Sequence, residues 1–350
     1  MRKGLRLALP QIVIVLLVVA VVLAAGVSLT AGASNASALA VAAHWLGLAA
    51  PDAISARDLL IVESIRLPRV VMGLLVGAAL AVSGAVMQGI FRNPLADPGL
   101  AGVSAGAGLG AAAMIVLGGS LALPMAGVVG YAALPAAAFL GGLTTTVILY
   151  VLSTRLGRTS IATMLLAGIA LGALSGAATG LLVYMADDKQ LRDLTFWSMG
   201  SLGGATWPRI VTLSVVLAAS FAVLPFLARG LNALALGEAA AWHMGISVER
   251  LKRSAIVIVA AMTGVSVAVS GGIGFVGIVV PHVLRLAIGP DHRFLLPASA
   301  LLGGALLVLA DAVARTVAAP AELPIGIVTA LAGAPFFLWL LLRRRSILDM

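Results

Sequence analysis

The sequence contains no cysteine and few charged or aromatic residues: 10% of its 350 residues are charged and 5% are aromatic. Without cysteine, disulfides, thiolate metal sites, iron–sulfur clusters and cysteine nucleophiles are excluded. So few charged side chains cannot cover a water-soluble protein of this size, because 61% of the residues are hydrophobic and the mean hydropathy is +1.15. The composition therefore predicts a protein that lies in a lipid bilayer.

The apolar content comes mainly from alanine, leucine, valine and 40 glycines, which let helices pack closely within lipid. The net charge of +9 could suggest a nucleic-acid partner, but such a partner needs basic residues clustered on one solvated face. Here the basic residues fall between apolar runs. We expect tight helix packing and no nucleic-acid partner.

The amino-terminal apolar run allows two interpretations. Arg2, Lys3 and Arg6 precede it, and the residues from Ala33 to Ala38 could form a signal-peptidase site. We favour a membrane span, because the run is long enough to cross a bilayer and further spans follow.

Apolar windows divide the chain into a single transmembrane domain, residues 1–350, with about ten membrane-spanning helices. We expect these helices at residues 7–31, 58–91, 98–118, 124–154, 159–186, 207–229, 248–271, 273–289, 293–317 and 323–343. With the amino terminus in the cytoplasm, most of the 22 Lys and Arg residues fall in cytoplasmic segments. The positive-inside rule therefore predicts that both termini are cytoplasmic.

One short motif occurs twice. Ala81–Gly84 and Ala268–Gly271 both read Ala-Val-Ser-Gly, each about fifteen residues after a basic pair. In the predicted topology the first basic pair is outside and the second inside, as in an inverted structural repeat. Chance is an equal alternative, since these four residue types are abundant.

Six motifs occur in an order typical of one family. They are Arg66-Leu67-Pro68-Arg69, Gly77 to Gly84 with Gln88, Arg92 to Pro98, Leu236-Gly237-Glu238 to Gly245, Gly274 to Arg285, and Asp291-His292-Arg293 to Asp311 and Arg315. The series closes with Glu322 to Gly326 and Gly333 to Phe337. With them the chain resembles the FecCD-type permeases of bacterial ABC importers for iron-siderophores, haem and cobalamin. The resemblance covers roughly residues 60 to 345.

The resemblance implies an all-α permease of the type II ABC importer fold that forms a homodimer in the bacterial inner membrane. Two cytoplasmic ATPase subunits, which hold ATP-Mg, and a periplasmic substrate-binding protein are its implied partners. The chain lacks the phosphate-binding loop Gly-x-x-x-x-Gly-Lys-Ser/Thr, so we expect no catalytic site, cofactor or metal in this chain.

The resemblance also assigns roles to particular residues. It places the contact with the ATPase in the cytoplasmic segment 231–253, at Leu236, Gly237, Glu238, Ala239, His243 and Gly245. An amphipathic loop anchored at lipid headgroups is the simpler alternative.

Arg66, Arg69 and Arg315 lie in outer segments, and in the family the matching arginines bind glutamates of the binding protein. Snorkelling of these side chains to the interface is the alternative.

Asn93, Leu95, Thr159 and Ser160 match the family's cytoplasmic gate. By themselves they predict a turn and a helix N-cap, and both interpretations can hold together.

Haem is the expected cargo, because the segment from Asp187 to Gly200 resembles the haem-importing branch; a ferric siderophore and cobalamin are the alternatives. We expect none of the four histidines to ligate haem, because a permease must release its cargo. An ion-coupled secondary transporter and an intramembrane enzyme are disfavoured, since the apolar windows contain no ionisable residue near mid-membrane.

Overall fold

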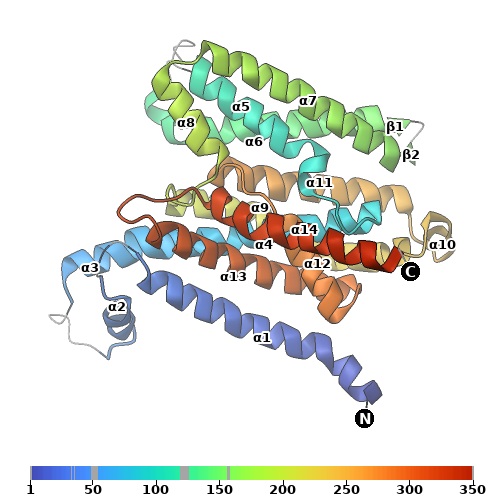
Figure 1. The fold of residues 1–350 in the computed structure, drawn as a ribbon, viewed down its shortest axis with the longest axis horizontal. Helices are drawn as coiled ribbons and strands as arrows, with labels where there is room; N and C mark the ends of the chain where they lie inside the picture. Colours follow the sequence, from blue (N-terminus) through green and yellow to red (C-terminus); the bar gives the residue numbers. More distant parts are fainter. Residues whose placement is uncertain are drawn as a thin grey trace.

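The computed structural model describes residues 2–32, 34, 36–48, 54–118, 126–155 and 158–348. Most of its long helices run along one common direction and form a bundle with two ends (Figure 1). The start of α1 (Arg2–Thr30), the end of α14 (Ile325–Leu348) and α10 (Glu238–His243) lie at one end, and α3 (Ala56–Ile61) lies at the other. We call these the α10 end and the α3 end.

The other helices lie between these two ends or, like the short α2 (Ala38–Trp45) and α8 (Asp188–Ser198), near the α3 end. The rest are α4 (Leu67–Phe91), α5 (Val103–Leu117), α6 (Ala126–Ser153), α7 (Ile161–Met185), α9 (Trp207–Leu234), α11 (Val248–Ser270), α12 (Val276–Ile288) and α13 (His292–Thr316). A π-helical turn, Val62–Arg66, joins α3 to α4, and a 3-10 turn, Pro98–Ala101, precedes α5. At the α10 end, β1 (Thr154–Arg155) and β2 (Arg158–Thr159) form a short antiparallel hairpin between α6 and α7.

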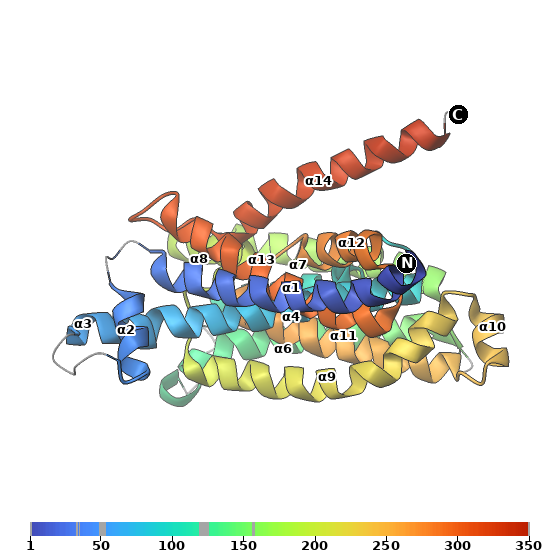
Figure 2. The same cartoon turned by 90° about the horizontal axis from the view of Figure 1, so that it is seen from below.

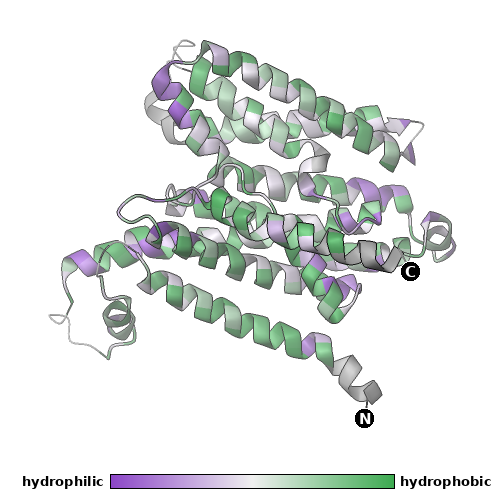
Figure 3. Ribbon diagram, viewed as in Figure 1, coloured by the Kyte–Doolittle hydropathy of each residue, from purple (hydrophilic) through white to green (hydrophobic). Residues whose placement is uncertain are grey.

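The helices have the length and composition of membrane spans. Seven helical stretches of the described chain are long and apolar enough to cross a membrane, and three shorter apolar helices accompany them: Val103–Leu117, Val276–Ile288 and Ile325–Trp339. Hydrophobic residues dominate the middle of the bundle, and hydrophilic residues gather towards its ends (Figure 3). The predicted all-α membrane fold is confirmed.

The central element is α4, which contacts α9, α11, α12 and α13 and is buried along most of its length. Glycine makes these close contacts possible. Gly77 faces Gly303 of α13, and Gly84 faces Gly277 of α12; a Cβ atom at Gly77 or Gly84 would collide with a backbone carbonyl oxygen. Within lipid there is no hydrophobic driving force between helices, so they associate through close packing. The glycines allow the backbones to approach closely enough for this.

The outer helices leave apolar surface uncovered. Within their apolar windows, only 11% of the residues of α1 and 17% of those of α7 are buried. The last helix, α14, contacts α12 and α13 and then diverges from the rest of the bundle (Figure 2). Such faces require lipid or a further protein subunit to cover them.

Several boundaries differ from those expected. The helix expected at 207–229 continues to Leu234, because Leu231 and Leu234 are fully buried while Arg229 is exposed and does not interrupt the helix. The last helix extends to Leu348 rather than to residue 343. Residues 124 and 125, where the fourth helix was expected to begin, lie outside the described residues.

Two sequence features take a definite place. The segment 231–253 consists of three pieces: the end of α9, the short helix α10, and the beginning of α11. Ala81–Gly84 lies in α4, and Ala268–Gly271 closes α11, a helix that contacts α4. The inverted repeat itself stays a prediction.

Candidate functional sites at the two ends of the bundle

Arg66 lies at the α3 end and is only 3% exposed. Its guanidinium donates hydrogen bonds to the carbonyl oxygens of Leu29 at 2.7 Å, Ala36 at 3.1 Å and Ser34 at 2.6 Å. The carbonyl of Leu29 belongs to the last turn of α1, where carbonyl groups lack helical partners and favour a positive charge. Arg66 therefore ties the end of α1 and the segment after it to the beginning of α4.

Arg69 and Arg315 share one buried carboxylate. Asp311 of α13 accepts from Arg69 at 2.9 Å and pairs with the Nε of Arg315 at 3.0 Å, and all three side chains are less than a tenth exposed. Arg69 also donates from Nη1 to both carboxylate oxygens of Glu322, at 2.8 and 2.9 Å. Arg315 donates to Ser28 Oγ at 2.7 Å. These contacts bring α1, α4, α13 and the α13–α14 loop together.

The three predicted docking residues thus line one cavity of about 250 Å³, together with Glu322. Three guanidinium groups face two carboxylates, so the cavity carries a net positive charge. Instead of snorkelling to solvent, the arginines are already hydrogen-bonded within the chain. Glu322 is the exposed member of the cluster, since 48% of its side chain is accessible, and an incoming carboxylate would meet it first.

At the α10 end, two glycines delimit the short helix that the sequence assigned to ATPase contact. Gly237 precedes α10 with φ at +109°, and Gly245 follows it with φ at +80°. L-residues rarely adopt these conformations, so both turns favour glycine. They place α10 beyond the ends of α9 and α11 (Figure 2).

The surface of α10 and its flanks is apolar and exposed. Leu236, Trp242 and Met244 are 73%, 68% and 51% exposed. Trp242 lines a hollow of about 830 Å³ together with Glu238, Ala239 and Gly245. An apolar side chain next to a hollow, outside the span region, is typical of a protein–protein contact.

A buried lysine connects α10 to the expected gate. Lys252 of α11 pairs with Glu238 at 2.9 Å and Glu249 at 3.3 Å, and its Nζ donates to the carbonyl oxygen of Thr159 at 3.0 Å. Glu249 in turn accepts from the backbone N–H of Thr159 at 2.8 Å. The sequence placed Glu238 and Thr159 in separate sites, and the structure joins them through Lys252 and Glu249. Only the charge of these two linking residues was visible in the sequence.

The remaining gate residues form local structure. Asn93 Oδ1 accepts from the backbone N–H of Leu95 at 3.0 Å, as in an Asx turn, and Ser160 Oγ accepts from the N–H of Thr163 as the N-cap of α7. No hydrogen bond joins these two loops within the described part of the chain. Nearby, burial raises the pKa of Asp97, which accepts a hydrogen bond from the N–H of Gly99 at 2.7 Å.

The histidines do not converge. His243 lies on α10, whereas His292 is buried at the start of α13 and its Nδ1 lies 2.8 Å from Asn232 Oδ1. Across the described residues, no three His, Asp or Glu side chains are placed to hold one metal ion.

Comparison with known proteins links this geometry to transport. The model of the FecCD transport family matches residues 15–343. The hemin transport system permease protein HmuU of Yersinia pestis is 49% identical over 283 residues, covering 81% of this chain and 83% of the relative. The cobalamin import system permease protein BtuC of Halobacterium salinarum is 48% identical over 281 residues, covering 80% of this chain and 73% of the relative.

A solved structure shares the arrangement of helices. It is described as an inward-facing conformation of a transporter assigned to the metal-chelate type of ABC transporter. The two chains superpose with a TM-score of 0.81 at 34% sequence identity, over 95% of this chain and 99% of the other. Nearly the whole polypeptide therefore adopts the fold of an ABC transporter permease.

Proposed function

The chain belongs to the FecCD transport family, and we propose that it is the permease through which an ATP-driven importer moves haem into a bacterial cytoplasm. The role of ABC importer permease is that of its relatives, and it has their fold. The observation that carries haem as cargo is the 49% identity to the hemin permease over four fifths of the chain.

Cobalamin is the second candidate cargo. The cobalamin permease of Halobacterium salinarum is almost as similar, at 48% identity. The metal-chelate transporter of matching fold also keeps a ferric siderophore among the alternatives. All three cargoes are large chelates, which suit a wide path between two subunits better than a tight pocket within one.

The working unit that we propose is a homodimer with two ATPase subunits and one periplasmic binding protein. The uncovered faces of α7 and α14 support a second copy beside them. The exposed apolar residues of α10 support docking of the ATPase, which places the α10 end in the cytoplasm and the α3 end in the periplasm. Both chain termini then lie on the cytoplasmic side of the inner membrane.

Docking of the binding protein at Arg66, Arg69 and Arg315 has to proceed by exchange, because these side chains are buried and paired. Glu322 is the most accessible partner, and it holds Arg69 Nη1 through both oxygens. A carboxylate of the binding protein takes the place of Glu322 on Arg69. Glu322 lies three residues before α14, so its release frees the loop that leads into that helix.

Coupling to ATP hydrolysis passes through Lys252. The ATPase contacts α10, and movement of α10 pulls on Glu238, which is paired with Lys252. Lys252 also holds the backbone of Thr159, next to Ser160 at the start of α7. The linkage is short and polar, so a small displacement of α10 reaches the expected gate. Asn93 and Leu95 form the other part of this gate, in a turn after α4.

The experiment that tests the function is reconstitution of the permease with its ATPase and binding protein in vesicles. Uptake of haem, a ferric hydroxamate and cobalamin is compared with ATP present and absent. ATP-dependent uptake of haem above the other two is expected. If cobalamin were taken up in preference to haem, cobalamin would be the cargo. Uptake driven by an ion gradient without the ATPase would overturn the assignment as an ATP-driven importer.

A further inference from the structure

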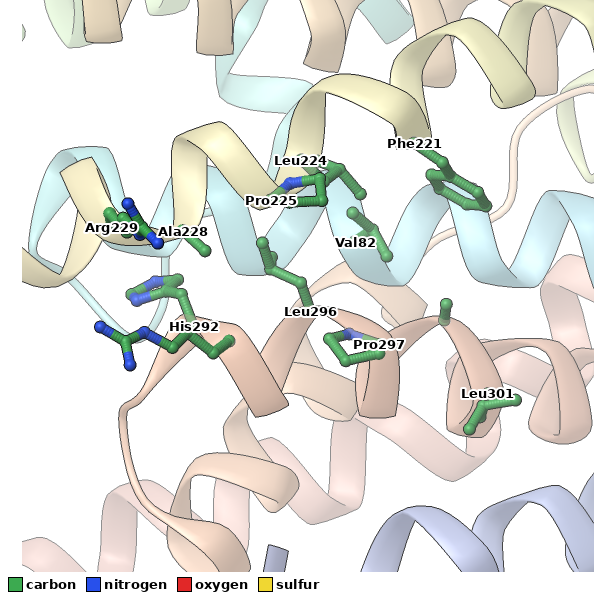
Figure 4. Close-up of a pocket in the computed structure, with 12 residues that line it drawn as sticks. Val82, Phe221, Leu224, Pro225, Ala228, Arg229, His292, Leu296, Pro297 and Leu301 are labelled. Atoms are coloured by element: carbon green, nitrogen blue, oxygen red, sulfur yellow. The ribbon is translucent and has the colours of Figure 1, made fainter. Parts of the chain in front are cut away.

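A groove of about 650 Å³ runs between α9 and α13, away from the sites described above. Most of its lining is apolar, from Val82 on α4, Phe221 and Leu224 on α9, and Leu296 and Leu301 on α13. Figure 4 shows Phe221 and Leu301 at one end of the groove and Arg229 and His292 at the other. The groove is therefore elongated, with its polar groups at a single end.

Two arginines provide the charge at that end. Arg229, in the last two turns of α9, and Arg293, in the first turn of α13, both line the groove, and both are exposed. Among the described residues, no carboxylate forms an ion pair with either side chain. The groove thus combines apolar walls with two unpaired positive charges at the α10 end.

A hydrogen-bonded connection holds the two arginines on either side of the groove. Asn232, three residues after Arg229, donates from Nδ2 to Asp291 at 2.6 Å, and its Oδ1 accepts from the backbone N–H of His292 at 2.9 Å. Asp291 also accepts from the backbone N–H of Arg293 at 2.9 Å. Although burial opposes ionisation of Asp291, these hydrogen bonds keep its pKa below the usual value. Its carboxylate accepts from the Asn232 amide and the Arg293 backbone N–H, and the nearby positive charge of Arg293 also lowers its pKa.

The position in the bundle limits what can occupy the groove. Arg229 lies near the end and Arg293 near the beginning of two helices that are long and apolar enough to cross a membrane, so we expect both at the level where lipid headgroups meet water. The neighbouring face of α9 is apolar and exposed, with Val215 and Phe226 65% and 78% exposed, as expected of a surface against lipid. An acyl chain fits the apolar length of the groove, and a phosphate fits its basic end.

We propose that this groove binds an anionic glycerophospholipid of the cytoplasmic leaflet, with the phosphate held between Arg229 and Arg293 and an acyl chain lying between α9 and α13. The lipid fills the gap that Pro225 and Pro297 border and stabilises the packing of α9 on α13. The proposal rests on the topology proposed above, with the α10 end in the cytoplasm, but it stands independently of the cargo.

Phosphatidylglycerol is the probe for the test, with phosphatidylcholine as the neutral comparison. The purified full-length permease is titrated with each lipid in detergent, and bound lipid is counted by native mass spectrometry. We expect phosphatidylglycerol to bind more tightly than phosphatidylcholine. The combined substitution Arg229→Ala with Arg293→Ala should weaken phosphatidylglycerol binding about twenty-five-fold, since each arginine near an anionic lipid contributes about fivefold. Arg155→Ala, an exposed arginine at the same end outside the groove, should leave binding unchanged.

A second variant tests the acyl-chain part of the groove. Ala300→Phe places a ring in the groove and should reduce phosphatidylglycerol binding, whereas Val211→Phe on the exposed face of α9 should not. Inorganic phosphate should not compete at millimolar concentration. Equal binding of the two lipids, equal losses with Arg155→Ala, or full competition by inorganic phosphate would overturn the proposal.

Discussion

The two ends of the bundle differ in how they use charge. At the α3 end, Arg66, Arg69 and Arg315 are buried and paired within the chain. At the α10 end, a single buried lysine lies beneath an exposed apolar surface around Trp242. Charges that are buried and paired hold helices in place, whereas exposed apolar side chains await a partner. The comparison teaches that the α3 end is already paired within the chain, while the α10 end presents an uncovered apolar surface, in keeping with the ATPase docking proposed there.

The largest effect is expected from removing the shared carboxylate of the α3 end. Asp311→Ala leaves Arg69 and Arg315 buried with a charge that no longer has its central partner, so the free energy of unfolding should fall by about 3–5 kcal/mol. Thermal unfolding of the purified permease measures this. Val313→Ala on the exposed side of the same helix should stay within about 0.5 kcal/mol of the parent. If both variants lowered the free energy of unfolding by a similar amount, Asp311 would contribute no more than an ordinary exposed residue of α13, and the α3 end would not depend on its buried ion pairs.

At the α10 end, truncation of Trp242 should act on binding instead of folding. Because its side chain is 68% exposed in the isolated chain, Trp242→Ala should change stability by less than about 0.5 kcal/mol. It should weaken association with the ATPase by about 2 kcal/mol or more, measured by pull-down titration or light scattering. Phe226→Ala, at an exposed residue on the side of α9, is the matched control and should leave association unchanged. If Trp242→Ala bound the ATPase as tightly as the parent, α10 would not be the docking surface.

The linkage between α10 and Thr159, in the expected gate, predicts that transport can be separated from ATP hydrolysis. Lys252→Met keeps the length of the side chain but leaves Glu249 and the carbonyl of Thr159 without this donor, which should cost about 1–3 kcal/mol of stability. In reconstituted vesicles, ATP hydrolysis should continue while cargo uptake per ATP falls. The matched variant Arg250→Met, two residues away, should retain uptake, because Arg250 donates locally to Ser247 Oγ at 2.9 Å. Full coupling in Lys252→Met would show that the gate does not depend on this residue.

The smallest effect is expected at Glu322, since ion pairs with a half-exposed partner contribute about 1 kcal/mol or less. Glu322→Gln should barely change stability, but it should increase affinity for the binding protein because Arg69 Nη1 becomes available. Surface plasmon resonance with the binding protein measures this. A decrease in affinity would mean that Glu322 belongs to the docking surface itself and does not compete with the incoming carboxylate.

Much of this molecule could be predicted from its sequence. The apolar windows indicate where helices lie, since each must satisfy its own backbone hydrogen bonds within lipid. The motif order indicates the family. The path of α9 beyond Arg229 was missed, because a charged residue is a poor marker of a helix end when its side chain can reach water. The sequence placed Arg66, Arg69 and Arg315 in outer segments, but it gave no sign that they line one cavity.

The sequence by itself determined that this chain crosses a membrane, belongs to one family of importers and presents charged segments at two ends, because composition and local apolar length decide these properties. Only the tertiary structure decided which charges are buried and what they pair with. Arg69 and Asp311 are separated by 242 residues, and Lys252 reaches Thr159 across 93. The free energy of a charge depends on neighbours that the folded chain brings together, and no local pattern in the sequence specifies those neighbours.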